Sequence, residues 1–157
     1  MRRKDKEVTD KKVIEEILTK SEFCRIAMHD DEYPYIVPLN YGYRDNTLYF
    51  HSAAEGKKIE LLKMNNKVCF EIEHTAKTIL NEQPAKSTTK YLTVIGFGEV
   101  EIITDTVEKK KGLDIIMSHY GNNGNNVYNQ SQLNSLVILK LTINSITAKR
   151  SGNWEEP

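Results

Sequence analysis

The sequence has few of the features that mark secreted or membrane proteins. Its two cysteines, Cys24 and Cys69, each lie in an apolar run and form no CxxC pair, which excludes a disulfide framework and predicts two reduced core thiols. No stretch approaches the roughly 20 apolar residues that a membrane helix needs. The charged amino terminus lacks the apolar segment of a signal peptide. We therefore expect a cytoplasmic protein with no membrane partner.

Net charge is absent as well. The sum of lysine and arginine is 22, and the sum of aspartate and glutamate is also 22. A balanced chain has no general electrostatic attraction to nucleic acid or to an anionic membrane. Acidic neighbours dilute the basic residues at positions 2–6, and we interpret this segment as a solvated start of the chain. No nucleic-acid partner is expected.

The segments that are present predict a mainly β protein with peripheral helices. Residues 1–157 are long enough for a single domain with a sizeable core, and they contain no repeat and no linker. Six strands at short spacing predict a small barrel, and closing a barrel removes unpaired strand edges. Apolar residues alternate or run together in six segments, at residues 23–29, 35–43, 47–51, 67–73, 91–104 and 137–148.

Caps and breaks predict the helices and loops between these strands. Asp10 can cap a helix that Ser21 closes, and residues 56–65 have the pattern of a short helix. Residues 75–89 are polar and contain Pro84, and residues 121–134 are rich in asparagine, so we predict a long loop at each. Asp45-Asn46 is a hairpin turn signal. A last helix is predicted from Asp105 or Thr106 to about Tyr120, with Leu113, Ile116 and Met117 facing inward.

The most informative segment is residues 51–58, where a strand gives way to a helix. The first turn of a helix carries unpaired N–H groups and a partial positive charge. Lys57 and Lys58 add to that field, Ser52 adds a hydroxyl donor, and Gly56 allows close approach of the backbone. This arrangement suits a phosphate group. The alternative is an ordinary capped helix with solvated lysines.

Two strand segments carry a further signal. Pro38 lies inside residues 37–42 and cannot donate to a strand ladder, so it marks an edge or a bulge with free backbone groups. Such groups beside aromatic side chains suit a planar heterocycle, although a simple bulge is the alternative. In residues 93–98, Gly96 and Gly98 indicate a bulge or a close approach by another backbone or a ligand. They do not form a dinucleotide fingerprint, and tight barrel packing is the alternative.

The histidines offer no recognisable metal or nucleophile site. His51 follows Tyr49 and Phe50, and a lone histidine in that position is more often structural than a ligand. The four histidines have no metal-ligand spacing, so no metal is expected. No Ser-His-Asp or Cys-His arrangement can be assembled from the sequence order.

Taken together and in order, these segments resemble one family. The sequences YIVPLNYG (35–42), YFHSAAEGKK (49–58), KVCFE (67–71) and VIGFG (94–98) are similar to those of pyridoxamine-5′-phosphate-oxidase-like proteins, in the nitroimidazole-resistance-type (Nim) branch. The resemblance covers nearly the whole chain. It implies a six-stranded split β-barrel of the FMN-binding type. It also implies a homodimer with one FMN at each end of the subunit interface.

The resemblance also implies roles for individual residues. Residues 37–41 are expected to line the isoalloxazine ring of FMN. His51 is expected beside the flavin, and Ser52 in contact with the flavin or its phosphate. The two lysines are expected to hold the phosphate, and Thr93 to turn a polar group toward the flavin. His51 is the candidate catalytic residue because the pKa of histidine lies near working pH. The implied cofactor-binding residues are Val37, Pro38, Leu39, Asn40, Tyr41, His51, Ser52, Lys57, Lys58 and Thr93.

The chain departs from the family pattern in residues 83–93. This segment has no cysteine, and Leu92 stands where a basic residue is common, so the resemblance does not extend to substrate contacts from here. The carboxyl-terminal residues Arg150 and Trp154 either reach the partner subunit's site, as in the vitamin-making oxidases, or form a free tail.

The implied activity is that of an FMN-dependent oxidoreductase acting on a small planar substrate, such as a nitro-aromatic compound. One alternative is a flavin- or haem-binding split barrel without turnover, in which His51 is an axial ligand. A second is a small barrel that binds nucleic acid, which the zero net charge disfavours.

Overall fold

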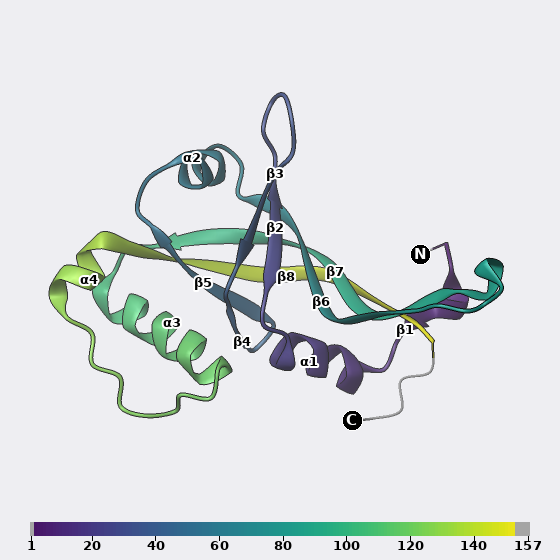
Figure 1. Cartoon of the computed structure of the whole chain (residues 1–157). Helices are drawn as coiled ribbons and strands as arrows, with labels where there is room; N and C mark the ends of the chain where they lie inside the picture. The colour runs from purple at the N-terminus through teal and green to yellow at the C-terminus, as the bar shows by residue number, and fades with distance from the viewer. Residues whose placement is uncertain (1, 153–157) are drawn as a thin grey trace.

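The computed structural model describes residues 2–152, and one antiparallel sheet dominates it (Figure 1). The strand order is β3-β2-β6-β7-β8-β5-β4, and β1 pairs with β8 off this path. The prediction of a mainly β split-barrel fold is confirmed. The strands are β1 (Glu7–Val8), β2 (Cys24–Met28), β3 (Tyr35–Leu39), β4 (Gly42–Arg44), β5 (Thr47–Ala53), β6 (Lys67–Ile79), β7 (Thr88–Ile103) and β8 (Leu136–Ser151).

The sheet is curled but not closed. β3 and β4 lie at its opposite ends and are not paired with each other, although only Asn40 and Tyr41 separate them in the chain. The prediction of one strand over residues 35–43 is wrong, because β3 and β4 are separate strands. The alternation hides the break because Tyr41 stays buried, in phase with the inward residues of β3.

Four α-helices flank the sheet. Asp10 caps α1 through a hydrogen bond from the Lys12 N–H, and Asp105 caps α3 in the same way. In the asparagine-rich region Asn129 forms a capping box, so the prediction of loop throughout residues 121–134 is wrong. The helices are α1 (Lys11–Lys20), α2 (Lys57–Met64), α3 (Thr106–His119) and α4 (Gln130–Ser135), with short 3₁₀ helices η1 (Lys4–Lys6) and η2 (Pro84–Lys86). No helix within residues 2–152 is long and apolar enough to span a bilayer.

The core lies inside the curled sheet. Tyr41, Phe50 and Phe70 are its largest fully buried side chains. The predicted irregularity at Gly98 is confirmed, because the β7–β8 register shifts between Phe97 and Gly98. A Cβ on Gly98 would lie 2.2 Å from a backbone oxygen of β8, so only glycine fits this close approach.

The prediction of a long loop at residues 75–89 is wrong. β6 continues to Ile79 and β7 begins at Thr88, so most of this segment is a two-stranded arm that projects from the body beside β1 (Figure 1). The arm has no core beneath it. Both of its faces are therefore polar, and the alternation that identifies half-buried strands is missing.

The buried face of α3 also differs from the prediction. Ile116 is buried as predicted, but Met117 is exposed and Leu113 is only half-buried. The helix packs on the sheet through Gly112 and Ile115 instead. At the carboxyl end of the chain, Arg150 lies in β8 opposite Leu92, and Trp154 lies outside the described residues.

Candidate functional site

The start of α2 is an uncapped helix terminus. Gly56 occupies the N-cap position with a φ of 104°, and no side chain caps the helix. The Gly56 carbonyl accepts hydrogen bonds from the Ile59 and Glu60 N–H groups, at 2.9 and 3.1 Å. The N–H groups of Lys57 and Lys58 have no partner among the described residues, so they keep their capacity to donate to an anion.

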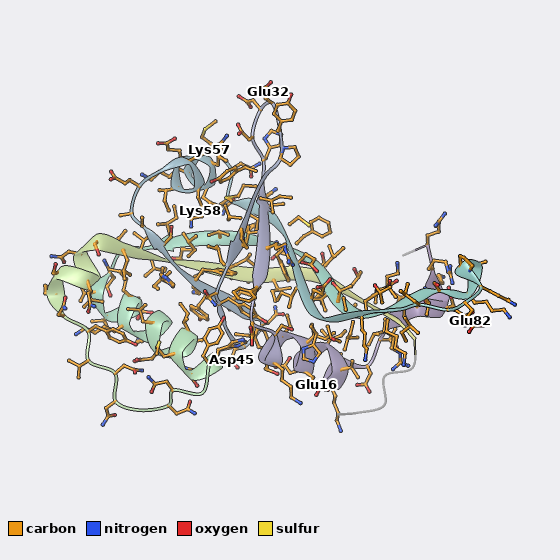
Figure 2. The ribbon with its side chains drawn as sticks, viewed as in Figure 1. Glu16, Glu32, Asp45, Lys57, Lys58 and Glu82 are labelled. Carbon is orange, nitrogen blue, oxygen red and sulfur yellow. The ribbon has the colours of Figure 1, made fainter. Side chains whose placement is uncertain are left out.

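The two lysines at this terminus have different surroundings. Lys57 forms an ion pair with Asp30 (Nζ–Oδ2 2.5 Å), and its Nζ lies 5.0 Å from the centre of the Tyr35 ring. Its bond to Asp30 raises the pKa of Lys57. Lys58 is half-buried and has no ion pair or hydrogen bond among the described residues, and burial lowers its pKa. Figure 2 shows Lys58 between α2 and the strands, and Lys57 on the side of the loop that carries Glu32.

Ser52 and His51 point to opposite faces of β5, since successive side chains of a strand alternate. Ser52 is 5% exposed and faces the interior, and its hydroxyl makes no hydrogen bond to another residue in 2–152. His51 is exposed on the outer face, opposite Ile138 of β8. One ligand can therefore contact both side chains only where it passes over the end of the strand.

β3 is an edge strand, and this confirms the prediction from Pro38. Pro38 is exposed on the outer face, opposite Arg25 of β2. Val37 and Leu39 turn inward and pack against the core. Their side chains are thus directed away from the outer surface.

The corner after β3 is tied to both flanking helices. The Tyr41 side chain is fully buried, and its hydroxyl donates to the Leu18 carbonyl at the end of α1, at 2.9 Å. The Tyr41 N–H and the amide nitrogen of Asn40 both donate to the Tyr120 phenol oxygen, each at 3.2 Å. Tyr120 follows α3 and was not predicted as a site residue.

Thr93 belongs to a polar cluster on the outer face of the sheet. Its hydroxyl lies 3.0 Å from both the Ile72 carbonyl and Oε1 of Glu71. The other Glu71 oxygen accepts from Arg25 at 2.9 Å. Sequence reasoning missed Arg25 and Glu71 because only the β2–β6–β7 register brings them to Thr93.

Exposed apolar side chains surround this cluster. Ile36, Ile95 and Phe97 are 58%, 46% and 56% exposed, and all three belong to the outer face of the sheet. Phe97 and Cys69 line an open hollow of about 560 Å³ on this face. We call these four residues the outer apolar patch.

None of the predicted site residues lines the hollow beside Phe97 or the two hollows beside α1 and α3. The contacts of Lys57 with Asp30 and Tyr35 do bring the start of α2 next to the start of β3. Among the described residues, no group of three or more His, Cys, Asp or Glu side chains could hold a metal ion.

A comparison with known protein families identifies the family to which this chain belongs. Residues 10–150 match the family model described as pyridoxamine 5′-phosphate oxidase, and the chain belongs to this family. No curated protein matches the sequence.

Solved structures agree with this assignment. A protein of Bacteroides thetaiotaomicron VPI-5482, provisionally assigned to 5-nitroimidazole antibiotic resistance, is 34% identical, with a TM-score of 0.82 over 92% of this chain and 86% of that one. The FAD and heme binding protein of Mycobacterium smegmatis is 18% identical, with a TM-score of 0.83 over 97% and 76% of the two chains. An FAD-binding protein of Mesorhizobium loti is 22% identical, with a TM-score of 0.64 over 91% and 96%. The last two likenesses concern the fold alone. The family match and the 34% identical structure confirm the resemblance to the nitroimidazole-resistance-type branch.

Proposed function

We propose that this protein binds FMN at an interface between two identical subunits and acts as an oxidoreductase on small planar molecules. The observation that carries the proposal is the start of α2. The helix terminus is uncapped, the half-buried Lys58 lies in its first turn, and the unused hydroxyl of Ser52 belongs to the strand that leads to it. Family membership and the 34% identical nitroimidazole-resistance relative support the choice of cofactor and substrate class.

The residues present fit the terminal phosphate of FMN. Lys58 is a cation that has lost part of its hydration without gaining a partner, so an anion beside it restores a favourable interaction. The helix N–H groups and the Ser52 hydroxyl add donors. Lys57 is already paired with Asp30, so its contact with the phosphate requires that pair to open. We therefore assign the phosphate first to Lys58 and second to Lys57.

The flavin ring fits the open edge of β3. Pro38 and Asn40 are exposed there and offer side-chain contacts, whereas the side chains of Val37, Leu39 and Tyr41 face inward and support the edge from the core. Thr93 lies on the outer face. Bound FMN would supply hydride or electron transfer to a substrate on its open face.

A second copy of the chain completes the site in this proposal. The outer apolar patch exposes large apolar side chains that a second copy would cover. A second copy on the patch would shield the flavin ring from water. The exposed His51 would then hold or release a proton at its imidazole, close to the flavin.

Reconstitution tests the proposal. Purified protein is treated to remove bound ligands and then titrated with FMN, while flavin fluorescence and sedimentation are followed. We expect saturable quenching at one FMN per chain and a dimeric sedimentation mass. Mass spectrometry of the ligand released from untreated protein separates FMN from FAD and deazaflavins. Protein that stays colourless with excess FMN rules out the proposed function.

A further inference from the structure

We infer that Tyr120 is a positioning residue that fixes the side-chain amide of Asn40 and presents its carbonyl oxygen to the flavin ring. The inference rests on the proposed function. It starts from the short segment Asn40–Tyr41, which joins the open edge strand β3 to β4. Pro38 cannot donate to the sheet, and β3 has a neighbour on one side only, so contacts at this corner set the position of the edge.

The Tyr120 phenol makes three hydrogen bonds at the corner. Its hydroxyl donates to the Glu22 carbonyl at 2.5 Å, and its oxygen accepts from the Tyr41 N–H and from the Asn40 amide nitrogen, each at 3.2 Å. A phenol has one hydrogen and two lone pairs, so these bonds use its whole capacity. Removing the hydroxyl therefore breaks all three together.

This arrangement decides which way the Asn40 amide points. A backbone carbonyl can only accept, so the single Tyr120 hydrogen is committed to Glu22. The phenol can then only accept from Asn40, and the group that faces it must be the NH₂ of the amide. The Oδ1 of Asn40 is thereby left without a hydrogen bond among residues 2–152, on an exposed side chain beside the edge of β3.

The end of α1 holds the corner rigid. The last carbonyls of a helix have no partner within it. Here the Leu18 carbonyl in the last turn accepts from the Tyr41 hydroxyl at 2.9 Å, and the carbonyl of the C-cap residue Ser21 accepts from Nε2 of His119 at 2.7 Å. The rings of Tyr41 and His119 also pack together, with their centres 4.5 Å apart. Asn40 therefore projects from a fixed corner, and a fixed acceptor suits an N–H group on the edge of a planar heterocycle.

The test is a double-mutant cycle on the full-length protein. Tyr120→Phe, Asn40→Ala and the double variant are titrated with FMN. Losing one hydrogen bond to a neutral partner weakens binding about fivefold, and we expect this from each single variant. We expect the double variant to bind no more weakly than Asn40→Ala, because Tyr120 acts through Asn40. Tyr128→Phe is the control, since that hydroxyl bonds Asp114 away from the corner.

Two spectroscopic readouts separate positioning from a general loss of structure. The long-wavelength absorption band of bound flavin should shift in the same direction in both single variants and stay unchanged in Tyr128→Phe. In flavin-free protein, Tyr120→Phe should speed hydrogen exchange at the Tyr41 amide and average the Asn40 side-chain NMR signals. Wild-type binding with no effect of Tyr120→Phe, or equal and additive losses in the cycle, overturns the inference and leaves the proposed function standing. Wild-type protein that binds no flavin rejects both.

Discussion

Replacing Lys58 with methionine should weaken FMN binding without destabilising the fold. Lys58 is half-buried, has no ion pair among the described residues, and lies at the uncapped start of α2. Methionine keeps an unbranched apolar side chain, so the packing of the stem is largely retained. Only the ammonium group is removed.

The structure sets the size and direction of both effects. Hydrogen bonds to charged groups contribute about 1.5–3 kcal/mol, so the loss of one corresponds to roughly 10- to 150-fold weaker FMN binding. The free energy of unfolding of the flavin-free protein should rise or stay unchanged in Lys58→Met. In the wild type the Lys58 ammonium group is partly dehydrated and has no partner that compensates for this loss. Weaker binding with equal or greater stability is typical of a binding residue.

The pH dependence gives an independent check. Burial lowers the pKa of Lys58 in the folded protein below its value in the unfolded chain. Between these two values the unfolded chain binds more protons, so this group makes the stability rise with pH in that window. Lys58→Met should remove this contribution from the alkaline part of the stability curve.

Lys63→Met is the matched control, because Lys63 is exposed in the last turn of the same helix. Binding is measured by fluorescence titration and stability by urea unfolding of the flavin-free proteins. FMN affinity in Lys58→Met within twofold of the wild type would refute the assignment of the phosphate. So would equal losses in the two variants.

Three further predictions follow from the same site. Phe97→Asp should convert the proposed dimer to a monomer in sedimentation and lower FMN affinity together, because it places a charge in the outer apolar patch; an unchanged dimer would show that another face pairs. Asp30→Asn should tighten FMN binding a few-fold by freeing Lys57, and the neighbouring Asp31→Asn should not; equal affinity would mean that Lys57 never reaches the phosphate. His51→Ala should lower reductase turnover, by about 100-fold if the imidazole moves a proton, with FMN affinity nearly unchanged; wild-type turnover would make His51 structural.

Local patterns predicted those parts of the fold that depend on a few adjacent residues. Asp10 caps α1 because an aspartate side chain can reach the free N–H groups of the next turn. Asp45 and Asn46 form the predicted turn, with φ values of 49° and 59°. Gly98 lies at the predicted bulge. Each of these features is fixed by chemistry within a short stretch of chain.

Features that depend on burial or register were not predictable in the same way. The arm at residues 75–89 gave no periodic signal because neither of its faces is buried. Among the site residues, Tyr120 meets Asn40 only because α3 ends beside that corner, and Glu71 meets Thr93 only through the β6–β7 pairing. The motif around Lys58 indicates a phosphate site from the sequence alone. The sequence does not show that Lys57 is paired with Asp30, so the different roles of Lys57 and Lys58 became visible only in the structure.

The most direct test compares FMN with riboflavin, which has the same ring but no phosphate. Calorimetric titration of the wild type should give at least tenfold tighter binding of FMN, and Lys58→Met should bring the two affinities close together. Equal affinities for the two ligands in the wild type would contradict the claim that the start of α2 holds the phosphate. An unchanged preference for FMN in Lys58→Met would contradict the role of this lysine.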